Sequence, residues 1–315
     1  MIGEFMEREI RQQPDHLAMG AGAYFPQLSE ALQGKSFDMI LLAARGSSDN
    51  AALFARYLIE IHLGIPVCLA APSVITQHAS KMRFPKCLAV GISQSGAAPD
   101  VAEVLGFMRR QGHETLAITN TAGSRLDEES ANSLVLDVEK EQAVAATKTY
   151  TASLLALYEL TRALGAAIEP PAGKMPTQAW LDETLAAAQV AQGPVVRQRV
   201  LFSLGRGYRF SACHETALKL MECALLPCKA YSSADFQHGP KALAGPESAA
   251  IVFGEVPEGL VEQGCVVLPA LKGPDGPMSA IWEVIFGQWI ALLSSRARGL
   301  DPDAPRNLSK VTMTL

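Results

Sequence analysis

Two serine-containing turns follow short apolar runs and could bind an anion. They are Arg45-Gly46-Ser47-Ser48 and Ser93-Gln94-Ser95-Gly96. At the carboxyl end of a parallel strand, turn amides, serine hydroxyls and the N-terminus of the next helix all donate hydrogen bonds to an anion. Neither turn matches a Walker P-loop or G-x-G-x-x-G, so two such turns in one domain favour a simple phosphate group. Serine is also a common helix N-cap, and for one turn alone capping is the simpler interpretation.

Three charged residues with helical spacing are candidates for acid–base chemistry. Glu215, Lys219 and Glu222 are spaced i, i+4, i+7, which places them on one face of a helix. Taken alone, Glu215 and Lys219 predict an ordinary surface ion pair. Glu222 lies among apolar neighbours, where the pKa of a carboxyl group rises toward values suited to proton transfer. An exposed Glu222 on a polar stripe is an equally good interpretation of the spacing.

Three more segments contain reactive side chains. Small residues precede Lys148 at the start of a helix expected to reach Leu164, and Lys148 alone predicts a solvated lysine. His238 sits in a loop beside Gly-Pro, where a histidine is suited to proton transfer near neutral pH. Lys310 lies in a polar tail and by default predicts a flexible residue.

The elements that must position these residues alternate along the chain. Continuous apolar runs separated by amphipathic stretches are typical of βαβ units around a parallel sheet. In the first half, strands are expected at 37–44, 65–70, 86–93 and 113–120, and helices at 48–64 and 99–112.

The same alternation recurs after a proline-rich stretch at 169–178. In the second half, strands are expected at 198–207, 249–255 and 265–270, and helices at 208–225 and 279–299. Both halves place Arg-Gly between a strand and a helix, a weak similarity that fits two copies of one α/β domain. We expect an N-terminal helical segment over 1–36, a first domain over 37–170 and a second over 180–315.

Composition limits the classes of function. The 315 residues are 49% apolar and 19% charged, which fits about two domains and excludes disorder. The net charge of −5 argues against a nucleic-acid partner. The densest basic stretches are Arg109-Arg110 and the set Lys81, Arg83 and Lys86, so no local basic patch is expected either.

Cysteine usage and apolar stretches bear on the compartment. The six cysteines form no C-x-x-C pair and no zinc-ligand spacing, which predicts buried free thiols in a reducing compartment. The N-terminus has no apolar signal core, and 281–293 is too short to cross a bilayer. We therefore expect a cytoplasmic protein with no membrane partner, no metal and no cofactor.

Six segments together resemble the sugar isomerase (SIS) family, and within it the isomerase half of glutamine–fructose-6-phosphate aminotransferase. They occur in the family's order from about residue 40 to the end of the chain. They are the two serine turns, Val144-Ala145-Ala146-Thr147-Lys148, Ala217-Leu218-Lys219-Leu220-Met221-Glu222, His238-Gly239-Pro240 and Pro305-Arg306-Asn307-Leu308-Ser309-Lys310. The resemblance implies an α/β protein of two flavodoxin-like SIS domains, each a parallel sheet flanked by helices. It also implies a homodimer with active sites near the interface.

The resemblance also implies roles for individual residues. Glu222 would move the proton between C1 and C2 of a sugar phosphate. His238 would assist ring opening, in its own site or in that of the partner subunit. Lys310 would lie at the reactive end of the sugar. Contacts to the substrate are implied for Ser48, Ser93, Gln94, Ser95, Val144 and Ala146.

The chain departs from the family pattern in two places. The phosphate loop commonly continues Gly-Glu-Thr, whereas here it continues Gly96-Ala97-Ala98. The family's Ala-Ser-Thr-Lys is Ala145-Ala146-Thr147-Lys148. Each departure removes one hydroxyl group, so the substrate contacts at Ala98 and Ala146 are open.

The aminotransferases carry an N-terminal glutaminase domain whose cysteine follows the initiator Met. Here position 2 is Ile2 and the first expected strand starts at Phe37, so ammonia from glutamine is not expected. The chain looks like the deaminases that convert glucosamine 6-phosphate to fructose 6-phosphate and ammonia. The alternatives are a deglycase or isomerase of another amino-sugar phosphate, such as galactosamine 6-phosphate, and a non-catalytic phosphosugar sensor.

Overall fold

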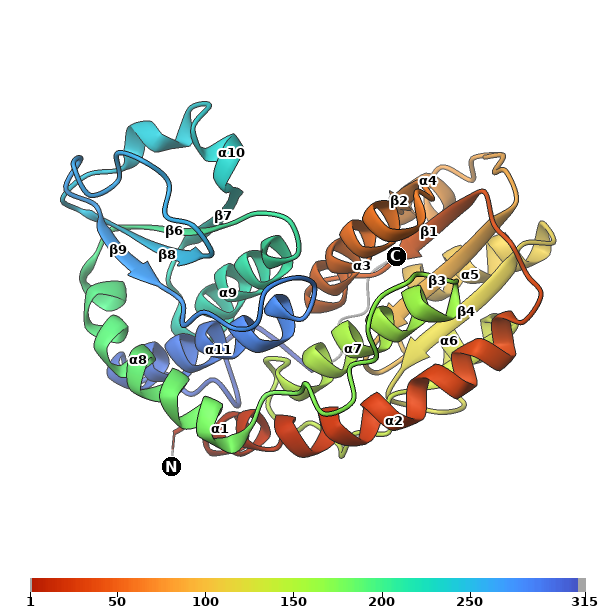
Figure 1. Cartoon of the computed structure of the whole chain (residues 1–315), viewed down its shortest axis with the longest axis horizontal. Coiled ribbons are helices and arrows are strands. Elements are labelled where there is room, and N and C mark those ends of the chain that lie inside the picture. The colour runs from red at the N-terminus through yellow and green to blue at the C-terminus, as the bar shows by residue number, and fades with distance from the viewer. Residues whose placement is uncertain (1, 311–315) are drawn as a thin grey trace. The chain divides into compact units, whose positions relative to one another are not determined.

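The computed structural model describes residues 2–310, and this range contains two parallel β-sheets (Figure 1). The chain divides into two compact units, each with one of the sheets. Within the described range, the first-sheet unit comprises residues 15–140 and 149–173. The second-sheet unit comprises residues 2–14, 141–148 and 174–310. Neither unit is continuous in sequence.

The first sheet has five strands in the order β2-β1-β3-β4-β5, all parallel. They are β1 (Met39–Ala43), β2 (Val67–Leu69), β3 (Cys87–Ser93), β4 (Glu114–Thr119) and β5 (Asn132–Val135). This is the flavodoxin-like order. The four expected strands are confirmed. The fifth was missed because it is short and begins with polar Asn132 and Ser133.

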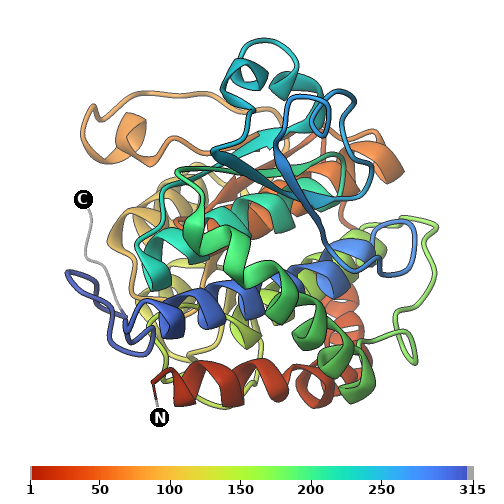
Figure 2. The same cartoon turned by 90° about the vertical axis from the view of Figure 1, so that its left-hand side faces the viewer.

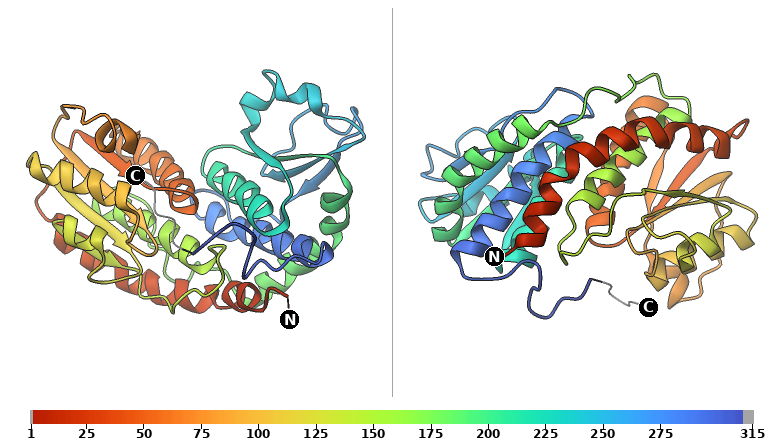
Figure 3. Two further views of the ribbon diagram at one scale, coloured as in Figure 1. Left: turned by 180° about the vertical axis from the view of Figure 1, so that it is seen from behind. Right: turned by 90° about the horizontal axis from the view of Figure 1, so that it is seen from below.

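Helices of this unit pack on the sheet through alternating strand residues. They are α2 (Gln13–Leu32), which starts in the other unit, α3 (Ser47–Leu63), α4 (Pro72–Thr76), α5 (Pro99–Arg110), α6 (Arg125–Glu129) and α7 (Lys148–Ala163), of which Lys148 belongs to the other unit. Leu41, Ala89 and Ala117 form one buried cluster with Val101 and Leu105 of α5. Helices α2 and α7 lie side by side, with the Arg162 guanidinium 4.3 Å from the centre of the Phe25 ring (Figure 3).

The second sheet has four parallel strands in the order β7-β6-β8-β9, which repeats the first four positions of the first sheet. They are β6 (Val200–Gly205), β7 (Cys228–Ser232), β8 (Ser248–Phe253) and β9 (Val266–Pro269). The three expected strands are confirmed. Strand β7 was missed because exposed Lys229 interrupts its apolar character at the edge of the sheet.

Helices and loops cover the two faces of the second sheet differently. The elements are α1 (Glu4–Arg11), α8 (Gln178–Arg197), α9 (Arg209–Ala224), α10 (Ser233–Phe236), the 3-10 helix η1 (Pro240–Leu243) and α11 (Ser279–Ala297). Helix α9 packs on the sheet and against α11, which also contacts α8 and α1 (Figure 2). On the other face, Phe236 and Leu260 cover Phe202 and Val252.

The close packing of α9 against α11 depends on Gly287. A Cβ atom at this position would lie 1.9 Å from the Thr216 hydroxyl oxygen, so only glycine allows the observed approach. Helix α9 also carries Glu222, one of the site residues expected from the sequence.

The first helix is tied to residues near the end of the described chain. The Gly3 amide donates to Asp301 Oδ1 at 3.0 Å, across 298 positions of sequence. The amides of Phe5 and Met6 each donate to the Asp303 carboxylate at 2.8 Å. Helix α1 therefore packs only once α11 and the segment after it are in place.

The cysteine expectation is confirmed: five thiols are buried, Cys68 is half-buried, and all six are free. Over residues 2–310, the structure has no helix that combines the length and the apolar character needed to cross a bilayer.

Candidate active site

Both serine turns lie at the carboxyl edge of the first sheet, after the neighbouring strands β1 and β3. Gly46 stands at φ 56°, ψ −129°, a conformation that glycine adopts readily, and α3 begins at the next residue. Strand β3 ends at Ser93, which is buried, and the Ala97 amide donates to Ser95 Oγ at 3.3 Å. The fold thus brings Ser48, Ser93, Gln94 and Ser95 to one edge, where the strand order changes direction and α/β proteins bind ligands.

Helix capping does not explain these serines. The N-cap of α3 is Gly46 and that of α5 is Ala98, and neither helix has a side-chain cap hydrogen bond. The capping interpretation is therefore wrong for both turns. The N-terminal amides of two helices, together with nearby hydroxyls, remain directed to the same edge, which suits a phosphate group.

Gly96 closes the second turn against Ser124, the residue that precedes α6. It adopts φ 62°, and a Cβ atom there would lie 2.0 Å from Ser124 Oγ. Behind the turns, the Arg45 side chain donates to the carboxylate of buried Asp100 at 2.6 Å. The edge is thus rigidly built.

Lys310 is held by the segment that contains Val144 and Ala146. Its ammonium group donates to Glu141 Oε2 at 2.8 Å and to the Ala143 carbonyl at 2.6 Å. The side chain of Glu141 is fully buried, and its other oxygen accepts from the Thr147 amide at 2.8 Å. The default expectation of a flexible tail lysine is therefore wrong. Val144 and Ala146 are half-buried next to this anchored lysine.

Lys148 is not solvated. Its side chain is 1% exposed, and its ammonium group donates to Gln12 Oε1 at 2.8 Å. The nearby Glu9 carboxylate accepts from the amides of Gln142 and Ala143. Burial, with a contribution from Glu141, raises the pKa of Glu9 to about 7. The expectation of a surface lysine failed because its partner comes from the N-terminal helices.

On α9, Lys219 contacts both carboxylates predicted to share its face. Its ammonium group lies 3.4 Å from Glu215 and is hydrogen-bonded to Glu222. The shared face is confirmed, but the surface ion pair is wrong: Glu215 is fully buried and Lys219 is 1% exposed. Burial opposes the charge of Lys219, yet the two carboxylates outweigh it and raise its pKa above the ordinary value.

The result is a partly exposed carboxylate held by a buried cation. The side chain of Glu222 is 25% exposed, so one end of this ion-pair chain reaches the surface of the unit. A carboxylate that solvent or a ligand can reach is a group suited to accepting a proton. Glu222 is therefore a candidate base.

His238 lies apart from these groups within the chain. It follows α10 in an exposed loop, with its amide donating to the Asp235 carbonyl at 3.0 Å, and Gly239 after it adopts φ 147°. Among residues 2–310, no hydrogen bond or ion pair joins His238 to Glu222 or Lys310.

The carboxyl edge of the second sheet also has a pocket, of about 720 Å³. Its lining includes Ser233 and the charged residues Arg206, Arg209, Glu255 and Lys272. The Arg209 Nε donates to both oxygens of buried Glu283, at 2.9 and 2.8 Å. Charged groups thus occupy the positions that hydroxyls occupy on the first sheet.

A family model for the SIS domain matches residues 36–163, which include all five strands of the first sheet and both serine turns. Residues 36–163 are therefore an SIS domain. Curated relatives of the chain include two glutamine–fructose-6-phosphate aminotransferases (isomerizing). The one from Aquifex aeolicus is 30% identical and the one from Lactiplantibacillus plantarum is 26% identical, both over 97% of this chain. The chain spans 57% of the length of each.

Among solved structures, the chain matches a glucosamine-6-phosphate deaminase from Thermotoga maritima. The TM-score is 0.84 at 25% identity, with 99% of this chain and 100% of that chain covered. These relatives are phosphosugar enzymes, which supports an enzyme in the same family.

Sequence reasoning missed one residue of the candidate site and misjudged another. Glu141 holds Lys310 from 169 positions away, so no local spacing indicates it. Lys219 was named as a candidate, but with Glu215 it was interpreted as an ordinary surface pair. Its position between two carboxylates at i−4 and i+3 was the available signal.

Proposed function

We propose that this protein converts glucosamine 6-phosphate and water to fructose 6-phosphate and ammonia. The observation that carries the proposal is the ion-pair chain on α9, which presents Glu222 as a partly exposed base beside a buried lysine. The match to the Thermotoga deaminase over nearly the whole of both chains supports this reaction.

The second-sheet unit is proposed to contain a second SIS domain. Its strand order β7-β6-β8-β9 repeats that of β2-β1-β3-β4. We retain the assignment of 1–36 as a helical segment, 37–170 as the first domain and 180–315 as the second. The role of the first domain is to bind the phosphate through Ser48, Ser93, Gln94 and Ser95.

The proposed chemistry is a proton transfer followed by hydrolysis. His238 assists opening of the sugar ring to the aldehyde. Glu222 takes the proton from C2, which bears the amino group, and returns it at C1. A proton also leaves the amino nitrogen and one is added to the C1 oxygen, so the C1 aldehyde becomes an alcohol and C2 becomes an imine. Water then adds to C2 and ammonia leaves, which gives the ketone of fructose 6-phosphate.

Lys219 and Lys310 have supporting roles in this scheme. Lys219 holds Glu222 in place through the hydrogen bond described above. Lys310, anchored by Glu141 and Ala143, is assigned to the reactive end of the sugar together with Val144 and Ala146. Glu141 is fully buried and is the carboxylate that pairs with Lys310. Its replacement would therefore leave Lys310 without its anionic partner.

A homodimer is part of the proposal, because cyclic dimers are the commonest homo-oligomers and His238 makes no contact with Glu222 in its own chain. Mixing Glu222→Gln and His238→Ala chains tests it. We expect partial recovery of activity in verified heterodimers if His238 serves the partner's site. No recovery would place both residues in the site of one subunit.

The function itself is tested by ammonia release from the purified protein. The panel consists of glucosamine 6-phosphate, galactosamine 6-phosphate and glycated amino-acid phosphates, with Glu222→Gln as the control. We expect the fastest release from glucosamine 6-phosphate. Faster release from another substrate would change the substrate assignment. Binding of these compounds without any turnover would support a sensor and overturn the enzyme.

A further inference from the structure

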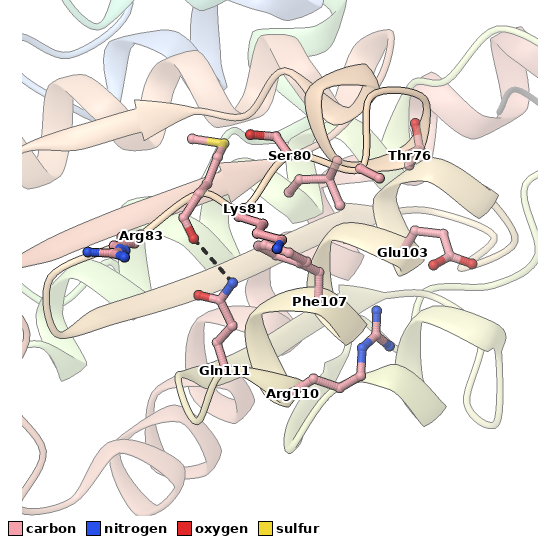
Figure 4. A pocket seen from close by; sticks show the side chains of 11 residues that line it. Thr76, Ser80, Lys81, Arg83, Glu103, Phe107, Arg110 and Gln111 are labelled. Carbon is pink, nitrogen blue, oxygen red and sulfur yellow. Dashed lines mark hydrogen bonds between the residues drawn. The ribbon is translucent and has the colours of Figure 1, made fainter.

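A second pocket lies in the first-sheet unit, away from the serine turns. It has a volume of about 740 Å³ and lies between the segment after α4 and the second half of α5 (Figure 4). The serine turns adjoin the first residues of α5, whereas the pocket is lined by residues from Glu103 to Gln111. A volume in this range fits a small organic ligand rather than a single ion.

Three basic side chains line this pocket: Lys81, Arg83 and Arg110. From the sequence, no local basic patch was expected. That expectation is wrong, because the fold brings residues 81–83 against α5. Within residues 2–310, none of the three makes an ion pair or a side-chain hydrogen bond. The acidic residue in the lining, Glu103, is already paired with Arg125. The pocket therefore has an excess of positive charge on a protein whose net charge is −5.

The shape of the pocket is fixed by the protein itself. Gln111 donates from its side-chain amide to the Met82 carbonyl at 3.2 Å, which ties the segment to α5 (Figure 4). The amides of His78 and Ser80 donate to carbonyls in α4 at 3.1 Å each. Ala79, in the lining, adopts φ 46°, a conformation that costs a non-glycine residue about 1 kcal/mol or more.

One wall of the pocket is apolar. Ile75, Met82 and Phe107 line it, and Figure 4 shows the side chains of Lys81 and Arg110 extending toward the space beside Phe107. Guanidinium and ammonium groups bind phosphate oxygens through charge-assisted hydrogen bonds. Cations around an apolar aromatic wall therefore suit a ligand that has several negative charges and a flat organic group.

We propose that this pocket binds a nucleoside diphosphate or a compound with the same chemistry. The diphosphate contacts Lys81 and Arg110, and the base lies against Phe107 and Met82. This site is separate from the proposed sugar-phosphate site and does not depend on the proposed reaction.

Isothermal titration calorimetry with ADP, pyrophosphate and adenosine tests the proposal on the full chain. We expect ADP to bind at least threefold more tightly than pyrophosphate, because the apolar wall contributes, and adenosine alone to give no measurable heat. The double variant Lys81→Ala/Arg110→Ala should weaken ADP binding at least tenfold. The matched control Lys86→Ala, an exposed lysine of the same segment that does not line the pocket, should change it less than twofold.

Three results would overturn the proposal. One is the absence of ADP binding to the wild type. Another is equal ADP affinity in the wild type and the double variant, whose folding is checked by its thermal midpoint. The third is loss of ADP binding in Ser95→Ala or in the presence of fructose 6-phosphate, which would place the nucleotide at the serine turns. If pyrophosphate bound as tightly as ADP, the contact proposed between the nucleobase and the apolar wall would be wrong.

Discussion

The two sheets share their strand order but differ at the edge where ligands bind. After β1 and β3, the first sheet has glycine, serine and glutamine, with the charges of Arg45 and Asp100 paired behind them. The second sheet also has Arg-Gly after its first strand, at Arg206-Gly207, but it has Arg209 where the first sheet has Ser48, and Glu255 where the first sheet has Ser95. The same backbone architecture thus presents hydroxyls at these two positions in one unit and charged side chains in the other.

The fold therefore determines where a ligand can bind, and the side chains at the edge of each sheet determine which ligand binds. Hydroxyls and helix N-termini suit a dianion, whereas Glu255 at the equivalent edge would repel one. In the proposed reaction, the second-sheet unit instead contributes the base on α9 and the anchored lysine. We therefore expect substrate binding and proton transfer to respond to mutations in different units.

The largest effect is expected for Glu222→Gln. The amide keeps the size of the side chain and removes the base, and loss of a general base typically costs about 10²–10⁴ in rate. The variant should release almost no ammonia, yet glucosamine 6-phosphate should still raise its thermal midpoint, because the phosphate contacts lie in the first-sheet unit. Turnover within about threefold of wild type corresponds to a change of under roughly 1 kcal/mol in the activation free energy. This result would contradict the assignment of Glu222 as the base.

The next effect concerns pH and the buried group Glu9 of the second-sheet unit. Its pKa is about 7 in the folded protein against 4.5 for the ordinary group, so the unfolded chain loses this proton first. Protonated Glu9 makes its whole contribution to the free energy of unfolding below pH 4.5. This contribution, up to about 3 kcal/mol, is lost as the pH rises through 7.

The pH-dependent contribution of Glu9 to stability is measured by the thermal midpoints of wild type and Glu9→Gln at pH 5 and pH 8. The wild type should lose stability relative to the variant between the two values. Glu247→Gln, which removes an exposed carboxylate of the same unit, should show no such change. A pH-independent difference for Glu9→Gln would contradict the shifted pKa.

A third prediction compares two glycines at equivalent edges. Gly96 and Gly254 both have positive φ, 62° and 97°, so alanine is strained at either position. A Cβ at Gly96 would lie 2.0 Å from Ser124 Oγ, whereas at Gly254 it would lie 3.2 Å from Cδ of the Arg209 side chain. Gly96→Ala should therefore destabilise by about 1–3 kcal/mol more, as overpacking does. Equal losses in denaturant unfolding would mean that the Ser124 contact relaxes freely.

The smallest effect tests the phosphate turns directly. Ser95→Ala or Ser48→Ala should raise KM for the sugar phosphate roughly tenfold, from the loss of one charge-assisted hydrogen bond. The control is Glu255→Ala at the equivalent edge of the second sheet, which should change KM less than twofold. An unchanged KM in both serine variants would refute the phosphate assignment, and a large effect of Glu255→Ala would remove the contrast between the two edges.

Local pattern was enough for much of the fold. Strand β3 is a continuous apolar run, and it was predicted within one residue because nothing polar interrupts it. The shared face of Glu215, Lys219 and Glu222 followed from helical spacing alone. Strand β7 was lost because a single exposed lysine broke the run.

Burial of charged groups could not be predicted in the same way. Lys148 and Lys310 both look like surface lysines, and their partners, Gln12 and Glu141, are distant in sequence. Whether a charge is buried depends on which element packs over it, and helical spacing contains no such information. The basic pocket was missed for the same reason, since Arg110 and Lys81 come from separate elements.

The tie between α1 and the segment at 301–303 has a consequence for the order of synthesis. Gly3 leaves the ribosome 298 residues before Asp301. At roughly 5–20 residues per second, its partner follows about 15–60 s later. During that interval Met6 and Ile10, which are fully buried in the folded protein, have no α11 to pack against. Helix α1 is thus made long before it can be folded, and the nascent chain must keep the apolar face formed by Met6 and Ile10 from aggregating until Asp301 has been made.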